Sequence, residues 1–103
     1  STPVAKTTVA QEEDDLLQKV IKHSAESILS FGTVGLAHTM NNYNKTLATK
    51  IENEYVQTFG YTGKVAHITE IYSLLFPKVL ILDESRSKNI IQILEARGWA
   101  FQK

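Results

Sequence analysis

Three histidines are the side chains of this sequence best suited to metal binding or proton transfer, and they are scattered. His23, His38 and His67 share no helical turn with one another. His67 has a carboxylate at helical spacing, Glu70, three residues further on. This pair would supply two of the four ligands that a zinc ion usually takes. We therefore expect a surface hydrogen bond at His67 and Glu70, and no metal site.

No other spacing in the sequence is typical of catalysis or of cofactor binding. Cysteine is absent, which excludes disulfides, Cys-ligated zinc and a cysteine nucleophile. Gly32 and Gly35 are not followed by the lysine of a phosphate-binding loop. Asp83 and Glu84 follow an apolar run, and such carboxylates more often begin a helix than bind a cation. We therefore expect a protein that is not an enzyme and that binds no cofactor.

A resemblance to the phosphoacceptor box of some sensor histidine kinases lies in residues 36–42, with the sequence LAHTMNN. In that box a histidine precedes an Asn-Asn pair on a helical hairpin. The resemblance implies a phosphorelay module in which an exposed His38 accepts the phosphoryl group. The acidic residue that usually follows the histidine is Thr39 here, and the common proline is absent.

A second resemblance, to the start of a response-regulator receiver, lies in residues 79–85, with the sequence VLILDES, and in the helix and aromatic segment that follow. It implies a strand over Val79–Leu82, a helix that ends near Gly98, and a second strand at Trp99–Phe101. The remaining elements of a receiver have no counterpart in the chain. Val79–Leu82 fits an apolar connector equally well.

Length and charge narrow the class of protein further. We expect 103 residues to form one domain, residues 12–103, after a flexible tail of residues 1–11. The 11 basic and 11 acidic side chains cancel, so the whole chain is not attracted to nucleic acid or to an anionic membrane. No apolar run approaches the roughly 18 residues of a membrane span, and no secretory signal pattern begins the chain. We expect an intracellular, cytoplasmic protein that does not bind membranes.

The fold class follows from one long apolar stripe over Leu36–Phe59. Its large residues recur at steps of three or four, which is the period of one helical face; they are Leu36, Met40, Tyr43, Leu47, Ile51, Tyr55 and Phe59. Asn, Thr and Gly are frequent in this stretch and are poor helix formers. Tertiary packing must therefore stabilise a long helix here.

Shorter stripes predict the remaining helices of a mainly α fold. The first covers residues 12–31, and its four leading carboxylates, Glu12–Asp15, oppose the positive end of the helix dipole. Gly32 should end it, so that the first two helices form a long antiparallel hairpin. Two shorter helices follow, over residues 64–76 and from Ser85 or Ser87 to about Arg97. Val79–Leu82 and Trp99–Phe101 would pair as a small two-stranded element near the carboxy terminus.

The function that we expect is protein–protein interaction. The long helix and the turn after it carry more tyrosine and phenylalanine than one hairpin covers, and aromatic residues are enriched in interfaces. The predicted partner-binding residues are Tyr43, Tyr55, Phe59 and Tyr61. The sequence thus favours an assembly module that self-associates as a homodimer, or binds one protein, through the second helix.

A small DNA-binding regulator of helix-turn-helix or winged-helix type is the main alternative. Its recognition helix would be the last helix, which presents polar and basic side chains near its start. The candidate nucleic-acid-binding residues are Arg86, Lys88, Asn89 and Gln92. The connector of about ten residues before this helix is longer than the turn in such motifs, and the basic excess is small.

Overall fold

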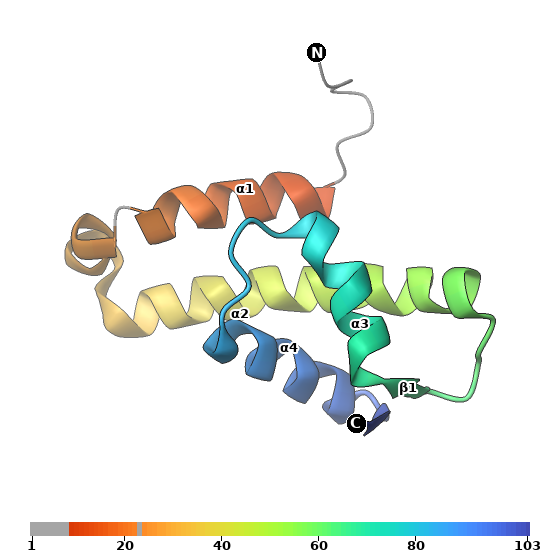
Figure 1. Cartoon of the computed structure of the whole chain (residues 1–103). Coiled ribbons are helices and arrows are strands. Elements are labelled where there is room, and N and C mark those ends of the chain that lie inside the picture. The colour runs from red at the N-terminus through yellow and green to blue at the C-terminus, as the bar shows by residue number, and fades with distance from the viewer. Residues whose placement is uncertain (1–8, 23) are drawn as a thin grey trace, which may run out of the picture.

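The computed structural model describes residues 9–22 and 24–103, and for residues 9–11, 20–22 and 24–37 it describes the backbone alone. The chain is mainly helical, as predicted, with one short sheet (Figure 1). The elements in chain order are α1 (Val9–Lys22), α2 (Ser24–Phe59), β1 (Val65–His67), α3 (Ile68–Leu75), the 3₁₀ turn η2 (Phe76–Lys78), α4 (Glu84–Ala96) and β2 (Ala100–Gln102). The tail predicted over residues 1–11 lies outside the described residues, apart from the three that begin α1.

The long helix α2 is the element on which the others pack. α1 lies along it, and α3 and α4 contact it from other directions (Figure 1). The predicted stripe is confirmed in its central part, where Leu47, Ile51 and Tyr55 are fully buried. The helix ends at Phe59 as expected, because Gly60 adopts φ 75° and leaves helical geometry.

The predicted boundary between the first two helices is wrong. α1 ends at Lys22, and Gly32 and Gly35 both lie inside α2, which begins at Ser24. A glycine costs a helix about 1 kcal/mol relative to alanine. That cost permits a helix end but does not force one when the helical hydrogen bonds continue on both sides.

The strand pairing also differs from the prediction. The predicted strand at Val79–Leu82 is a connector without regular structure, and the partner of β2 is β1, at the start of the expected third helix. The two strands are parallel, and Val65 is opposite Ala100. Parallel strands need a crossover connection, which here contains α3, η2 and α4. The strand prediction for Val79–Leu82 was therefore wrong, and the connector that this run fitted equally well is what the structure has.

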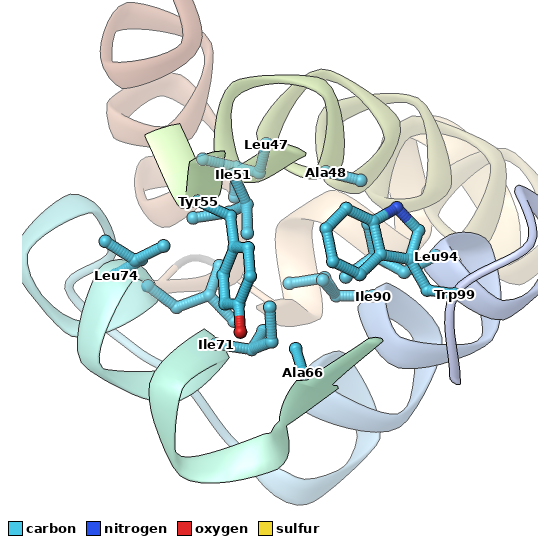
Figure 2. Packing of buried hydrophobic residues seen from close by; sticks show 11 residues of the cluster. Leu47, Ala48, Ile51, Tyr55, Ala66, Ile71, Leu74, Ile90, Leu94 and Trp99 are labelled. Atoms are coloured by element: carbon cyan, nitrogen blue, oxygen red, sulfur yellow. The ribbon is translucent and has the colours of Figure 1, made fainter. Parts of the chain in front are cut away.

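One apolar cluster joins α2, β1, α3 and α4 with Trp99, which directly precedes β2. Figure 2 shows the Tyr55 ring reaching from α2 toward Ala66 and Ile71, and the Trp99 indole beside Ile90. The Tyr55 and Trp99 rings meet edge to face with centroids 5.3 Å apart, an arrangement that aromatic pairs prefer. The other cluster members are Leu47, Ala48, Ile51, Leu74, Leu75 and Leu94.

Glu52 of α2 fixes Trp99 and Arg97 at one end of the cluster. Its carboxylate accepts a hydrogen bond from Trp99 Nε1 at 3.0 Å and forms an ion pair with Arg97 Nη1 at 2.6 Å. Partial burial alone would raise the pKa of Glu52, but these contacts to Trp99 and Arg97 hold it below the ordinary value. The ionised carboxylate therefore ties the end of α4 to α2.

The contribution of Glu52 to stability should depend on pH. Because the pKa of Glu52 is lower in the folded than in the unfolded chain, its stabilisation is present above the unfolded value of about 4.3 and is lost as the pH falls through the folded value. We expect Glu52→Gln to lower the free energy of unfolding by about 1 kcal/mol at neutral pH and hardly at all at acid pH. Urea unfolding at both pH values measures this.

The matched control is Glu95→Gln on the exposed side of α4, which should change the free energy of unfolding little at either pH. A cost for Glu52→Gln that stays the same from neutral to acid pH would contradict the role of the charge.

Candidate functional site

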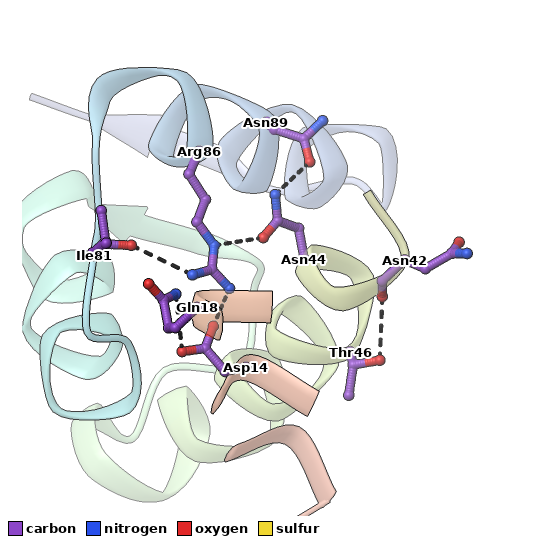
Figure 3. Close-up of polar contacts among 8 residues, drawn as sticks. All are labelled: Asp14, Gln18, Asn42, Asn44, Thr46, Ile81, Arg86 and Asn89. Carbon is purple, nitrogen blue, oxygen red and sulfur yellow. Dashed lines mark hydrogen bonds and ion pairs between the residues drawn. The ribbon is translucent and has the colours of Figure 1, made fainter. Parts of the chain in front are cut away.

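Arg86 is a buried charged residue whose side chain forms several hydrogen bonds. Only 1% of Arg86 is exposed, although an arginine has five N–H donors to satisfy. Figure 3 shows its side chain running from α4 to three other segments. Nε donates to Asn44 Oδ1 of α2 at 2.8 Å, Nη2 pairs with Asp14 of α1, and Nη1 reaches the Ile81 carbonyl at 3.4 Å.

Other buried amides extend this network. Asn44 Nδ2 donates to Asn89 Oδ1 at 2.8 Å, and Asn89 Nδ2 donates to Asn41 Oδ1 at 3.3 Å. Gln18 Nε2 lies 3.4 Å from Asp14 Oδ2, while Gln18 Oε1 has no partner. Burial raises the pKa of Asp14, and the hydrogen bond and charge of Arg86 oppose that shift. The network joins α1, α2, α4 and the connector in one contact.

This placement removes the principal residue from the predicted nucleic-acid-binding set. The Arg86 guanidinium is buried and hydrogen-bonded to acceptors inside the protein, so it offers no donor to a phosphate or a base edge. Asn89 is half-buried and bonded to α2, while Lys88 and Gln92 are exposed. The four residues therefore do not form one accessible surface. The expectation that polar residues early in a helix face solvent was wrong for Arg86.

The four aromatic residues predicted to bind a partner are also divided by the fold. Tyr55 is wholly buried, and its hydroxyl donates to Glu70 at 2.7 Å, so it is a core residue. Phe59 packs on Tyr55 with ring centroids 4.9 Å apart, and Tyr43 is half-buried. Tyr61, 55% exposed, is the one that presents most of its surface.

Two of the three histidines, His38 and His67, lie in the described part of the chain. His38 is exposed on α2, which is the condition that a phosphoacceptor must meet. His67 is exposed at the end of β1, and its backbone N–H donates to Glu70 Oε1 at 2.9 Å. The hydrogen bond from Tyr55, followed by that from the His67 backbone, lowers the pKa of Glu70. Glu70 therefore caps α3, and no group of three metal-ligating side chains occurs in the described part of the chain.

An apolar depression lies between α3 and α4, and the sequence did not reveal it. It has a volume of about 580 Å³ and is open to solvent. Its apolar residues are Ile68, Tyr72, Phe76, Leu82 and Ile91, and its polar rim consists of Asp83, Glu84, Ser87 and Lys88. We call this feature the α3–α4 groove. Phe76, at its edge, is 61% exposed.

Two further apolar side chains near the groove face solvent. Leu80 is 70% exposed and Ile81 lies beside it in the connector between η2 and α4. The sequence pattern placed this apolar run in a buried strand or connector, because apolar runs between turn signals are usually interior. The signal that pointed the other way is Pro77, which turns the chain out of α3 into η2.

A smaller depression of about 330 Å³ adjoins β1 and is lined in part by Tyr61, His67 and Glu70. Both strong donors to Glu70 bind the same oxygen, Oε1. The negative charge of Glu70 lies at the first turn of α3, where the helix dipole already compensates it. This depression therefore has less reason than the α3–α4 groove to take a ligand.

The buried ion pair should dominate the attachment of α1. We expect Arg86→Met to cost about 3–5 kcal/mol, since Asp14 would be left buried without its partner. The paired change Asp14→Leu with Arg86→Met should cost clearly less than the two single changes added together. Urea unfolding of the three variants measures the coupling.

Lys88→Ala, two residues further along α4 and exposed, is the control and should stay within about 0.5 kcal/mol of the parent chain. Strictly additive costs for the single changes would show that Asp14 and Arg86 do not act as a pair.

Two findings complete the description of the site. Among the helices that the structure describes, none is long and apolar enough to cross a membrane. Comparisons with protein-family models, with curated proteins and with solved structures gave no match, so the geometry of the chain itself is the basis for any functional conclusion.

Proposed function

We propose that the protein is a non-enzymatic protein-interaction module and that its binding surface is the α3–α4 groove. The observation that carries this proposal is the exposure of a large apolar side chain at one apolar depression. Phe76 lines the depression and leaves more than half of its surface in water. Exposed apolar patches next to a hollow with a polar rim are typical of protein interaction sites.

The α2 surface expected from the sequence is a weaker candidate for the same role. Its central aromatic residue, Tyr55, is in the core, and part of the Phe59 side chain packs against the Tyr55 ring. The α3–α4 groove, in contrast, keeps its apolar floor open. Removing that floor from water would contribute about 25 cal/mol per Å² of buried apolar area.

In this proposal α1 and α2 form the scaffold that supports the α3–α4 groove. We infer that they pair as an antiparallel helical hairpin, on which α3 and α4 are mounted. The support is local: Asp14 of α1 and Asn44 of α2 bind the same Arg86 side chain, and the charge of Glu13 is close enough to raise the pKa of Tyr43, after the larger effect of burial. The cytoplasmic location expected from the sequence is part of the same proposal.

The DNA-binding alternative loses its main contact, because the Arg86 guanidinium already binds Asp14 and Asn44. A phosphorelay role retains one supporting observation, the exposed His38. Neither alternative explains why Phe76 and Leu80 face solvent.

The groove should select amphipathic helical peptides from a phage-displayed library. We expect Phe76→Ser to weaken the binding of the selected peptides by about tenfold or more, while the fold is unchanged because Phe76 is largely exposed. Fluorescence anisotropy with labelled peptides measures the affinity, and circular dichroism checks the fold.

Two further substitutions make the result specific. Leu16→Ser changes an exposed apolar residue on α1, outside the groove, and should leave the affinity unchanged. Tyr61→Ser tests the surface predicted from the sequence. A loss of binding with Tyr61→Ser instead of Phe76→Ser, or a library that yields no binding peptide, would overturn the proposal.

A further inference from the structure

The rim of the α3–α4 groove carries a face of α4 that can pair with its own copy. Glu84, Ser87, Lys88 and Ile91 all line the groove, and they are spaced i, i+3, i+4 and i+7. Side chains at this spacing lie on one face of a helix, which is the pattern by which helices pack together. We call this set the α4 face. Glu84 and Lys88 of this set are exposed, while Ser87 and Ile91 are half-buried and Ile91 also packs against the apolar cluster.

The polar side chains of the α4 face either have a hydrogen-bond partner within the chain or form a pair of opposite charges. The Ser87 hydroxyl donates to the Asp83 carbonyl at 2.7 Å, so Ser87 can be buried without leaving a donor unpaired. The Asp83 carboxylate accepts the Arg86 backbone N–H at 2.7 Å as the cap of α4. Glu84 and Lys88, both exposed, form no ion pair within the described residues.

These two free charges are arranged for two-fold symmetry. When two copies of a helix pack antiparallel about a two-fold axis, residue i of one copy meets residue j of the other, and j meets i. An axis level with the turn between Glu84 and Lys88 brings each glutamate of one copy against the lysine of the other. The small Ser87 lies between them and allows the helices to approach closely.

Apolar surface and total charge favour the same occupant. Ile91 on the α4 face and Phe76 at the edge of the groove supply apolar contacts to flank the charged pairs. The net charge of the chain is zero, so two copies do not repel each other as whole molecules. A second copy of this chain therefore matches the groove in polarity and charge.

We propose that the protein forms a two-fold symmetric homodimer in which the α4 faces of two copies pack antiparallel, with Glu84 of each copy paired to Lys88 of the other. This proposal rests on the proposed function, because it names the occupant of the same groove. It differs from the dimer expected from the sequence, which used the second helix.

The test is the solution mass of the whole chain, by sedimentation equilibrium over a range of concentrations. We expect the parent chain to dimerise. Glu84→Lys and Lys88→Glu should each weaken the dimer by about tenfold or more, since each places like charges opposite one another twice. Glu12→Lys makes the same charge change at an exposed position of α1, outside the groove, and should leave the dimer unchanged.

Mixing the two single variants decides the geometry. The Glu84→Lys chain presents two lysines and the Lys88→Glu chain two glutamates, so an equimolar mixture should form a heterodimer about as tight as the parent dimer. The double variant Glu84→Lys with Lys88→Glu should also recover dimerisation. The recovery in the mixture does not follow from a change in helix stability, because each chain there keeps its own substitution.

The outcomes separate this proposal from the one on which it rests. A monomeric parent chain overturns the homodimer, while the peptide-binding result for Phe76→Ser stands or fails by itself. A dimer that Glu12→Lys weakens as much as Glu84→Lys, or a mixture that stays monomeric, overturns the α4 face as the interface.

Discussion

A buried guanidinium is the constraint on which much of this structure depends. Placing the charge of Arg86 inside the protein costs several kcal/mol unless acceptors surround it. The chain supplies those acceptors from α1, from α2 and from the connector before α4. Each of these segments is therefore held at a fixed position relative to α4. The apolar cluster by itself leaves α1 out, because its members come from α2 and the elements after it.

The two parts of the interior have different consequences for specificity. Apolar side chains such as Leu47 and Ile90 tolerate small shifts in packing, because the hydrophobic effect has no direction. The bonds of Arg86 to Asp14 and Asn44 do not tolerate such shifts, since a buried donor without an acceptor loses its full hydration. We infer that the apolar cluster provides most of the stability and that the polar network selects the position of α1. With the interior arranged in this way, α3 and α4 keep one side that no other described element covers.

The sequence predicted the elements well where one physical effect acts alone. The periodicity of α2 gave its buried face, and the positive φ of Gly60 and Gly98 agrees with the helix ends expected there. Prediction failed where long-range contacts decide. No local pattern shows that Arg86 will meet Asp14, 72 residues away, or that Val65–His67 will leave a helical stripe to pair with β2. The α3–α4 groove was missed for the same reason, since it exists only between two packed helices.

The parallel sheet has a consequence for the order in which the fold is made. β1 leaves the ribosome well before its partner, and α3, η2 and α4 are synthesised between the two strands. Until Ala100–Gln102 has been made, Ala66 has no strand to bind, and Trp99 cannot yet close over Tyr55. Helices can form locally while the chain grows, but contacts between distant segments must wait. The core of the nascent chain is therefore incomplete until Ala100–Gln102 has been made, and apolar side chains that this segment helps to cover stay exposed in that interval.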